Sequence, residues 1–179
     1  MDSAAEDDFR EFVVGRSPAL LVTAYLLTGD HGLAEDLLQV TLMKAHRHWA
    51  RVRSSGNPEA YVRRALANQR ISWWRRRRVA ESDAPLPDIP AGDDSGRVEL
   101  RDELWRALRQ LPPRTRAVLV LRYWEDVSEA ETAEILGCSV GSVKSQGSRG
   151  LRRLRAVLAE TESDGATAPA SGGRLDDRA

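Results

Sequence analysis

The segment 128–158 constrains the fold of this chain most, because a glycine-marked turn divides it into two short amphipathic segments. Ser128 is placed to cap the first helix, and Gly137 ends its apolar pattern. Ser139 is placed to cap a second, longer helix. The apolar residues of that helix can share one face: Val140, Val143, Leu151, Leu154 and Leu158. This arrangement predicts a helix-turn-helix.

The other face of the second helix carries hydrogen-bond donors and no acid. In a helix-turn-helix the second helix enters the DNA major groove, and the residues near its N-terminus meet base edges. The side chains so placed are Lys144, Ser145, Ser148 and Arg149. Further along, Arg152 continues the basic face toward the backbone, where arginine neutralises phosphates without reading sequence. The alternative is a helical hairpin with a solvated basic face. In that case the glycine-marked turn, the serine cap and the basic face would occur together only by accident.

Two glycines lie within the second helix, and each weakens a helix by about 1 kcal/mol relative to alanine. Gly147 and Gly150 therefore either permit the close approach of another backbone or leave the helix marginal until it docks. The sequence leaves both interpretations open.

Charge is segregated along the chain although the net charge is zero. Segment 61–78 holds seven arginines and no acid, whereas segment 81–103 holds eight acids against two arginines. A neutral protein with basic stretches and an acidic middle is poorly suited to tight, indiscriminate DNA binding. The pattern indicates DNA binding that requires a partner.

The N-terminal part of the chain is predicted to be helical. A first helix over 8–27 is interrupted near Pro18, and a second covers about 32–52. Core candidates of the second helix are Leu33, Leu37, Val40, Ala45 and Trp49. Its other face carries Asp36, Gln39, Met43 and Arg47. Without further information, the simplest interpretation of this face is a solvent-exposed surface.

A third helix, over 60–79, combines an apolar stripe with many arginines. The stripe consists of Val62, Ala65, Leu66, Gln69 and Trp73. Aromatic rings beside arginines fit single-stranded nucleic acid, where bases stack on rings and guanidinium groups follow the backbone. Arg64, Arg75 and Arg76 are the arginines assigned to DNA. The alternatives are a soluble helix with buried tryptophans, the preferred interpretation for Trp73, and a membrane-surface helix.

The rest of the chain divides by composition. Residues 80–97 are rich in proline, aspartate, serine and glycine, which predicts a flexible acidic linker. A second domain over 98–159 begins with leucines on one helix face, stops at Pro112–Pro113 and continues into a helix over 114–124. The tail, 160–179, is disordered by composition. We therefore predict an all-α protein: two small helical domains, 8–79 and 98–159, the second containing the helix-turn-helix.

Catalytic chemistry is hard to find in this sequence. No nucleophile motif, phosphate loop or metal-ligand spacing is present, so we expect no enzyme activity, no cofactor and no metal. The single cysteine, Cys138, cannot form an internal disulfide and lies in the turn, where a small, half-buried residue is expected. Without a membrane-spanning run or an apolar signal segment, the chain is expected to be cytoplasmic.

Three segments, in their order around the linker, resemble the extracytoplasmic-function sigma factors, the small initiation subunits of bacterial RNA polymerase. They are AEDLLQVTLMKAHRHW (34–49), AYVRRALANQRISWWRRRR (60–78) and LPPRTRAVLVLRYWEDVSEAETAEILGCSVGSVKS (111–145). The resemblance covers roughly 8–158. It implies a promoter-specificity subunit that directs core polymerase to promoters and helps to melt them.

The resemblance implies that the first domain is sigma region two. The second helix of that region binds the coiled coil of the beta-prime subunit, the clamp helices. The resemblance therefore implies that Asp36, Gln39 and Met43 bind polymerase. The third helix and the loop before it open the minus-ten element and capture a flipped base. Asn68 matches the asparagine of the base pocket, and Tyr61 matches an aromatic position at the helix start.

The second domain then resembles sigma region four, whose recognition helix reads the minus-thirty-five element. Its contacting positions match Lys144, Ser145, Ser148 and Arg149. The implied partners are core RNA polymerase, through the clamp helices and the beta flap, promoter DNA and an anti-sigma factor. The chain departs from the family pattern at Val40, Ser72 and Gly147, where the family usually has an acid, an aspartate and a longer side chain.

The alternative function is a stand-alone helix-turn-helix transcriptional regulator. Such regulators usually dimerise to span half-sites one helical turn apart. Neither domain has an obvious additional dimerisation helix, and the basic helix with Asn68 would be unexplained. An RNA-binding or membrane-surface adaptor rests only on the arginine run and leaves the helix-turn-helix unused.

Overall fold

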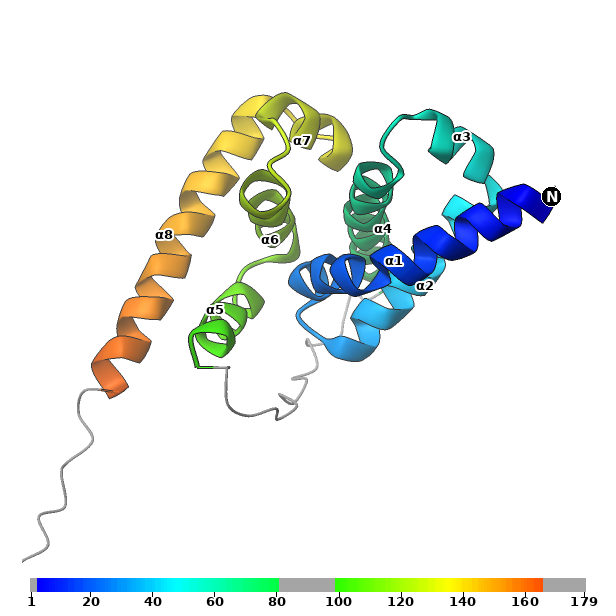
Figure 1. Ribbon diagram of the computed structural model, residues 1–179. Coiled ribbons are helices and arrows are strands. Elements are labelled where there is room, and N and C mark those ends of the chain that lie inside the picture. The colour runs from blue at the N-terminus through cyan, green and yellow to red at the C-terminus, as the bar shows by residue number, and fades with distance from the viewer. Residues whose placement is uncertain (1–2, 81–98, 166–179) are drawn as a thin grey trace, which may run out of the picture.

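The computed structural model describes residues 3–80 and 99–165, and every regular element in these two ranges is a helix. The elements are α1 (Ser3–Thr28), α2 (His31–Arg47), α3 (Trp49–Ser54), α4 (Pro58–Ala80), α5 (Glu99–Arg109), α6 (Pro113–Leu119), the π-helical turn η1 (Val120–Trp124), α7 (Glu129–Leu136) and α8 (Val140–Gly165). Helices α1–α4 form one domain and α5–α8 the other (Figure 1). The predicted all-α, two-domain fold is confirmed. Most of the predicted linker and tail lies outside the described residues, although α8 continues into the tail as far as Gly165.

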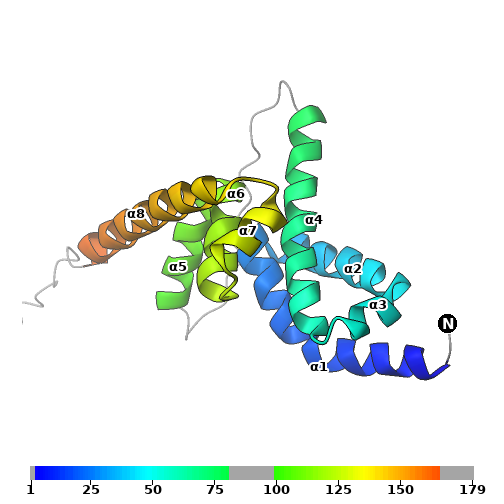
Figure 2. The same cartoon turned by 90° about the horizontal axis from the view of Figure 1, so that it is seen from above.

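In the first domain α1 packs against both α2 and α4. Buried side chains of all three helices form its core: Leu20, Leu27, Leu37, Leu66 and Ile71. The interruption expected near Pro18 does not occur: α1 continues through this residue, and Figures 1 and 2 both show α1 bending along its length. A proline inside a helix removes a backbone hydrogen bond and kinks the helix without always ending it.

The predicted second helix is divided at His48, whose backbone leaves the helical region at φ −124° and ψ 27°. The short helix α3 follows, held against α1 by Trp49. The Trp49 indole Nε1 donates to Asp8 Oδ2 at 2.7 Å, and its ring centroid lies 5.0 Å from those of Phe9 and Phe12. The expectation of one continuous helix over 32–52 was therefore wrong, because burial of Trp49 against α1 redirects the chain.

The helix-turn-helix forms as predicted. Ser128 Oγ accepts from the backbone N–H of Glu131 at 3.2 Å, and Gly137 ends α7 in the left-handed conformation at φ 59°. Ser139 Oγ accepts from the N–H of Ser142 at 3.1 Å at the start of α8. These local contacts satisfy helix-end groups that would otherwise lack partners.

Gly150 allows α8 to lie close to α6. A Cβ added there would meet Thr115 Cγ2 at 2.7 Å and Leu119 Cδ1 at 3.1 Å. At Gly147 the nearest atom would be Val118 Cγ1 at 3.8 Å, which is ordinary contact. Close approach is therefore the correct interpretation for Gly150, whereas the space at Gly147 would accept a methyl group.

The two domains also pack against each other. Arg116 is 5% exposed, and its guanidinium reaches from α6 to the end of α1, where it donates to Thr28 O at 2.7 Å. It also donates to Arg109 O at 2.8 Å and to Leu111 O at 3.3 Å. Burial and the nearby charges of Arg70 and Arg109 lower the pKa of Arg116 to about 10, so it remains protonated at neutral pH. One side chain thus joins the C-terminal ends of α1 and α5.

No helix in the described ranges is both long enough and apolar enough to cross a membrane.

Candidate nucleic-acid interface

A surface pocket of about 640 Å³ lies between α2 and α4. Tyr61, Asn68 and Arg75 line it from α4, so the structure brings these predicted DNA-binding residues together. The end of α2 adds Lys44 and Arg47, and His48 adds an imidazole. The pocket therefore combines an aromatic ring, a primary amide and several basic groups.

The loop before α4 sets the orientation of these side chains. Gly56 turns the chain at φ 80°, and Asn57 Oδ1 accepts from the N–H of Ala60 at 3.0 Å, which caps α4. Pro58 occupies the first helical position, as the sequence predicted. Tyr61 therefore lies in the first turn and Asn68 about two turns later.

The pocket can hold a nucleotide that has left a base stack. A ring can stack on the base, an amide can pair with a base edge, and cations can neutralise the flanking phosphates. Tyr61 is 38% exposed, and Asn68 is also exposed, so both are accessible. Lys44 Nζ donates to Oε1 of the buried Gln69 at 2.5 Å, which fixes the wall beside Asn68.

Lys44, Arg47 and His48 were not predicted as binding residues. The signal for Lys44 and Arg47 was the basic last turn of α2, which His48 follows directly. Sequence spacing along one helix does not reveal that this turn lies beside Asn68, because the crossing of α2 and α4 places them there.

The predicted recognition face lies on α8. Lys144, Ser145, Ser148 and Arg149 are all exposed. Arg149 Nε donates to Ser145 O at 3.2 Å, and Lys144 Nζ lies 3.6 Å from Glu129 Oε2 on α7. A second pocket, of about 280 Å³, lies beside this face. Its lining includes Lys144, Ser148 and Arg152 of the predicted set, with Arg122, Tyr123 and Arg155 in addition.

Two of the predicted DNA-binding arginines of α4 lie outside both pockets. Arg64 faces the other domain, where its guanidinium pairs with the Glu131 carboxylate on α7. Arg76 is exposed next to Arg75 on α4 but does not line the pocket.

The residues predicted to bind polymerase share one side of α2. Asp36, Gln39 and Met43 are all exposed, and Met43 is 53% exposed. The opposite side of α2 is buried: Ala34, Leu37, Leu38, Thr41 and Ala45. A partner can therefore bind the exposed side of α2 without disturbing the core residues on its buried side.

Comparison with known proteins identifies both domains. The family model for sigma-70 region 2 matches residues 13–79, and that for sigma-70 region 4 matches residues 101–154. The RNA polymerase sigma-E factor of Streptomyces coelicolor is 39% identical over 158 residues, covering 88% of this chain and 89% of the relative. The ECF RNA polymerase sigma factor EcfG of Rhodopseudomonas palustris is 30% identical over 155 residues, covering 85% and 86% of the two chains.

A solved structure agrees with these relatives. The sigma factor RpoE, in a co-crystal structure with the anti-sigma factor NepR from Bartonella quintana, is 31% identical to this chain. The TM-score is 0.61, with 85% of this chain and 97% of that chain covered. The helices, the order of the two domains and these similarities agree: the chain belongs to the sigma-70 family, as an RNA polymerase sigma factor of the extracytoplasmic-function group.

Proposed function

We propose a role for each surface in directing core RNA polymerase to promoters. Residues 8–79 act as region two: Asp36, Gln39 and Met43 bind polymerase, and the pocket with Tyr61, Asn68 and Arg75 captures a base of the minus-ten element. Residues 98–159 act as region four, in which the exposed face of α8 reads the minus-thirty-five element. The protein has no reaction of its own, because the polymerase performs the chemistry in the cytoplasm.

The observation that carries this proposal is the pocket between α2 and α4. Extruding a base from a duplex costs a few kcal/mol, which a binding pocket has to offset. The pocket offers an amide from Asn68, a ring from Tyr61 and cations from Arg75 and Lys44 within one hollow. A regulator that only occupies an operator has no use for such a pocket.

A gel shift at physiological salt, with and without core polymerase, tests the proposal. The free protein is expected to bind duplex promoter DNA weakly and with little sequence preference, because neither small basic surface neutralises many phosphates alone. Polymerase should convert the two contacts into joint recognition by raising their effective concentration. Tight, sequence-specific binding by the free protein, as a dimer on a palindrome, would favour the stand-alone regulator instead.

Two arginines of α8 separate base reading from phosphate contact in the same assay. Arg149→Ala is expected to cost about 1–3 kcal/mol in the polymerase complex and to relax preference at one minus-thirty-five position. Arg152→Ala is expected to weaken binding evenly across sequences. If both variants lost the same affinity on every sequence, Arg149 would contact the DNA phosphate backbone and not a base.

Charge reversal on α2 tests the polymerase surface. Asp36→Arg is expected to weaken co-purification with core polymerase by about tenfold or more, because like charges placed across an interface cost several kcal/mol. Its thermal midpoint should stay close to that of the unmodified protein, since Asp36 is exposed. Glu11→Arg, an exposed reversal on α1, is the matched control. Unchanged polymerase binding by Asp36→Arg would remove this surface from the proposal.

A further inference from the structure

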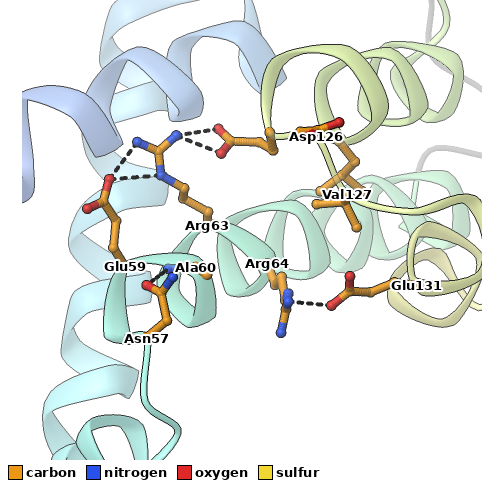
Figure 3. A pocket seen from close by; sticks show the side chains of 10 residues that line it. Asn57, Glu59, Ala60, Arg63, Arg64, Asp126, Val127 and Glu131 are labelled. Carbon is orange, nitrogen blue, oxygen red and sulfur yellow. Dashed lines mark hydrogen bonds and ion pairs between the residues drawn. The ribbon is translucent and has the colours of Figure 1, made fainter.

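The two sides of α4 differ in the groups that face their cations. On the side toward the other domain, carboxylates accept from the arginines. Arg63 Nη2 lies 2.7 Å from Glu59 Oε1, and its Nη1 lies 2.6 Å from Glu125 Oε2. Arg64 pairs with Glu131 in the same way (Figure 3). Each of these arginines therefore has an anionic acceptor beside it.

The pocket between α2 and α4 has a different lining. Among the described residues that line it, none is an aspartate or a glutamate. Its cations are Lys44, Arg47 and Arg75, and His48 adds an imidazole. Lys44 Nζ donates to the neutral amide of Gln69, at 2.5 Å from Oε1, and not to a carboxylate. A ligand in this pocket therefore meets several cationic donors and no carboxylate.

The neutral polar side chains of the pocket add few acceptors. Thr41 is buried, and its hydroxyl donates to Leu37 O at 2.7 Å. Asn68 and Ser72 lie one turn apart on α4, and each can donate as well as accept. Ser72 stands where the family usually has an aspartate. Because lysine and arginine can only donate, donors outnumber acceptors on the walls.

The four bases differ in what they offer to such walls. Thymine and guanine carry a keto oxygen, O4 or O6, where cytosine and adenine carry an exocyclic amine. The oxygen accepts from cations and amides, whereas the amine is a donor that needs an acceptor. The ring nitrogens through which cytosine and adenine accept, N3 and N1, lie next to that amine. Turning the base therefore does not separate the amine from the cations.

We propose that this pocket selects a keto base, thymine or guanine, over the amino bases cytosine and adenine. The inference rests on the proposed capture of a promoter base and adds the class of base that is captured. Asn68 and the surrounding cations donate to the keto oxygen. Ser72 permits this selection because it places no carboxylate one turn from Asn68.

Short single strands that carry one base between abasic sites test the selection without a known promoter. Each labelled strand is titrated with the full-length protein bound to core polymerase, with polymerase alone as the blank, and affinity is measured by fluorescence anisotropy. Strands with thymine or guanine are expected to bind about tenfold more tightly than strands with cytosine or adenine, a typical factor for one specific base contact. Equal affinity for the four bases, or tighter binding of the amino bases, would overturn the inference.

Ser72→Asp supplies the acceptor that the pocket lacks. It should lower the ratio of keto to amino affinity by about tenfold, because the exocyclic amine then meets a carboxylate. Ser72→Asn has nearly the same shape as Ser72→Asp without its charge and should keep the preference for keto bases. Ser54→Asp, at an exposed position on α3 outside the pocket, makes the same change in net charge and should leave the ratio unaltered. Partial unfolding would weaken all four strands alike, so a ratio unchanged by Ser72→Asp contradicts the selection by charge.

A strand with abasic sites throughout separates this inference from the proposed function. If it binds as tightly as the strands that carry a base, the pocket captures no base, and both the capture and the selection are wrong. If every base improves binding but the amino bases bind as tightly as the keto bases, the capture stands and the selection alone is wrong.

Discussion

Arg116→Ala is expected to lower the free energy of unfolding by about 3 kcal/mol, measured by urea denaturation of the full-length chain. The guanidinium donates to three carbonyl oxygens: Thr28 O, Arg109 O and Leu111 O. Its removal takes a donor from each of these acceptors, of which Thr28 O and Leu111 O are buried, and opens a cavity. The variant no longer has to bury a charged group, and burial of that charge is what lowers the pKa of Arg116. This gain offsets only part of the lost stability, because the carbonyl oxygens already compensate the buried charge.

Two further variants show whether geometry or charge is responsible. Arg116→Lys keeps the charge but loses the planar fork that reaches several carbonyls at once, so most of the destabilisation should remain. Arg106→Ala, at an exposed position on α5, should change the free energy of unfolding by less than about 0.5 kcal/mol. Full stability of Arg116→Lys would mean that the three-carbonyl contact contributes little.

Asn68→Ala is expected to reduce run-off transcription from duplex promoters by about tenfold to a hundredfold. The amide can pair with one base edge, and such a contact is worth about 1–3 kcal/mol of discrimination. On a template already melted over the minus-ten element, the variant should recover most of its transcription, because no base then has to be extruded from a duplex. Base preference at one minus-ten position should be lost on both templates.

Asn68→Asp keeps the shape of the side chain while replacing the amide donor by a second acceptor. It should fold normally and should fail with the preferred base as severely as Asn68→Ala. Circular dichroism and the thermal midpoint serve as controls for both variants. Equal loss on duplex and melted templates in a destabilised protein would make Asn68 a structural residue.

Local features were predicted well from the sequence because their causes are local. Ser128, Gly137 and Ser139 mark the helix-turn-helix through hydrogen bonds and a backbone conformation within a few residues. The break at His48 was missed because it depends on Trp49 meeting α1, whose residues lie about forty positions earlier. No propensity along 32–52 carries that information.

The same limit applies to the functional surfaces. Resemblance supplied Tyr61 and Asn68, and the pocket they share exists in the structure. The cations that complete it, Lys44 and Arg47, come from a different helix. The ion pair of Arg63 with Glu125 could not be predicted from the sequence either, because a linker of flexible composition favours independent domains and the pair forms only where the two domains pack together.

The opposite faces of α8 have an evolutionary consequence. Packing is concentrated on one face, where Val143 and Gly150 are buried against the rest of the domain. The exposed residues Ser145, Ser148 and Arg149 take no part in that packing. Point mutations can therefore alter promoter preference without unfolding the domain. After gene duplication, paralogues with this architecture can diverge toward separate sets of target genes while they continue to share one polymerase.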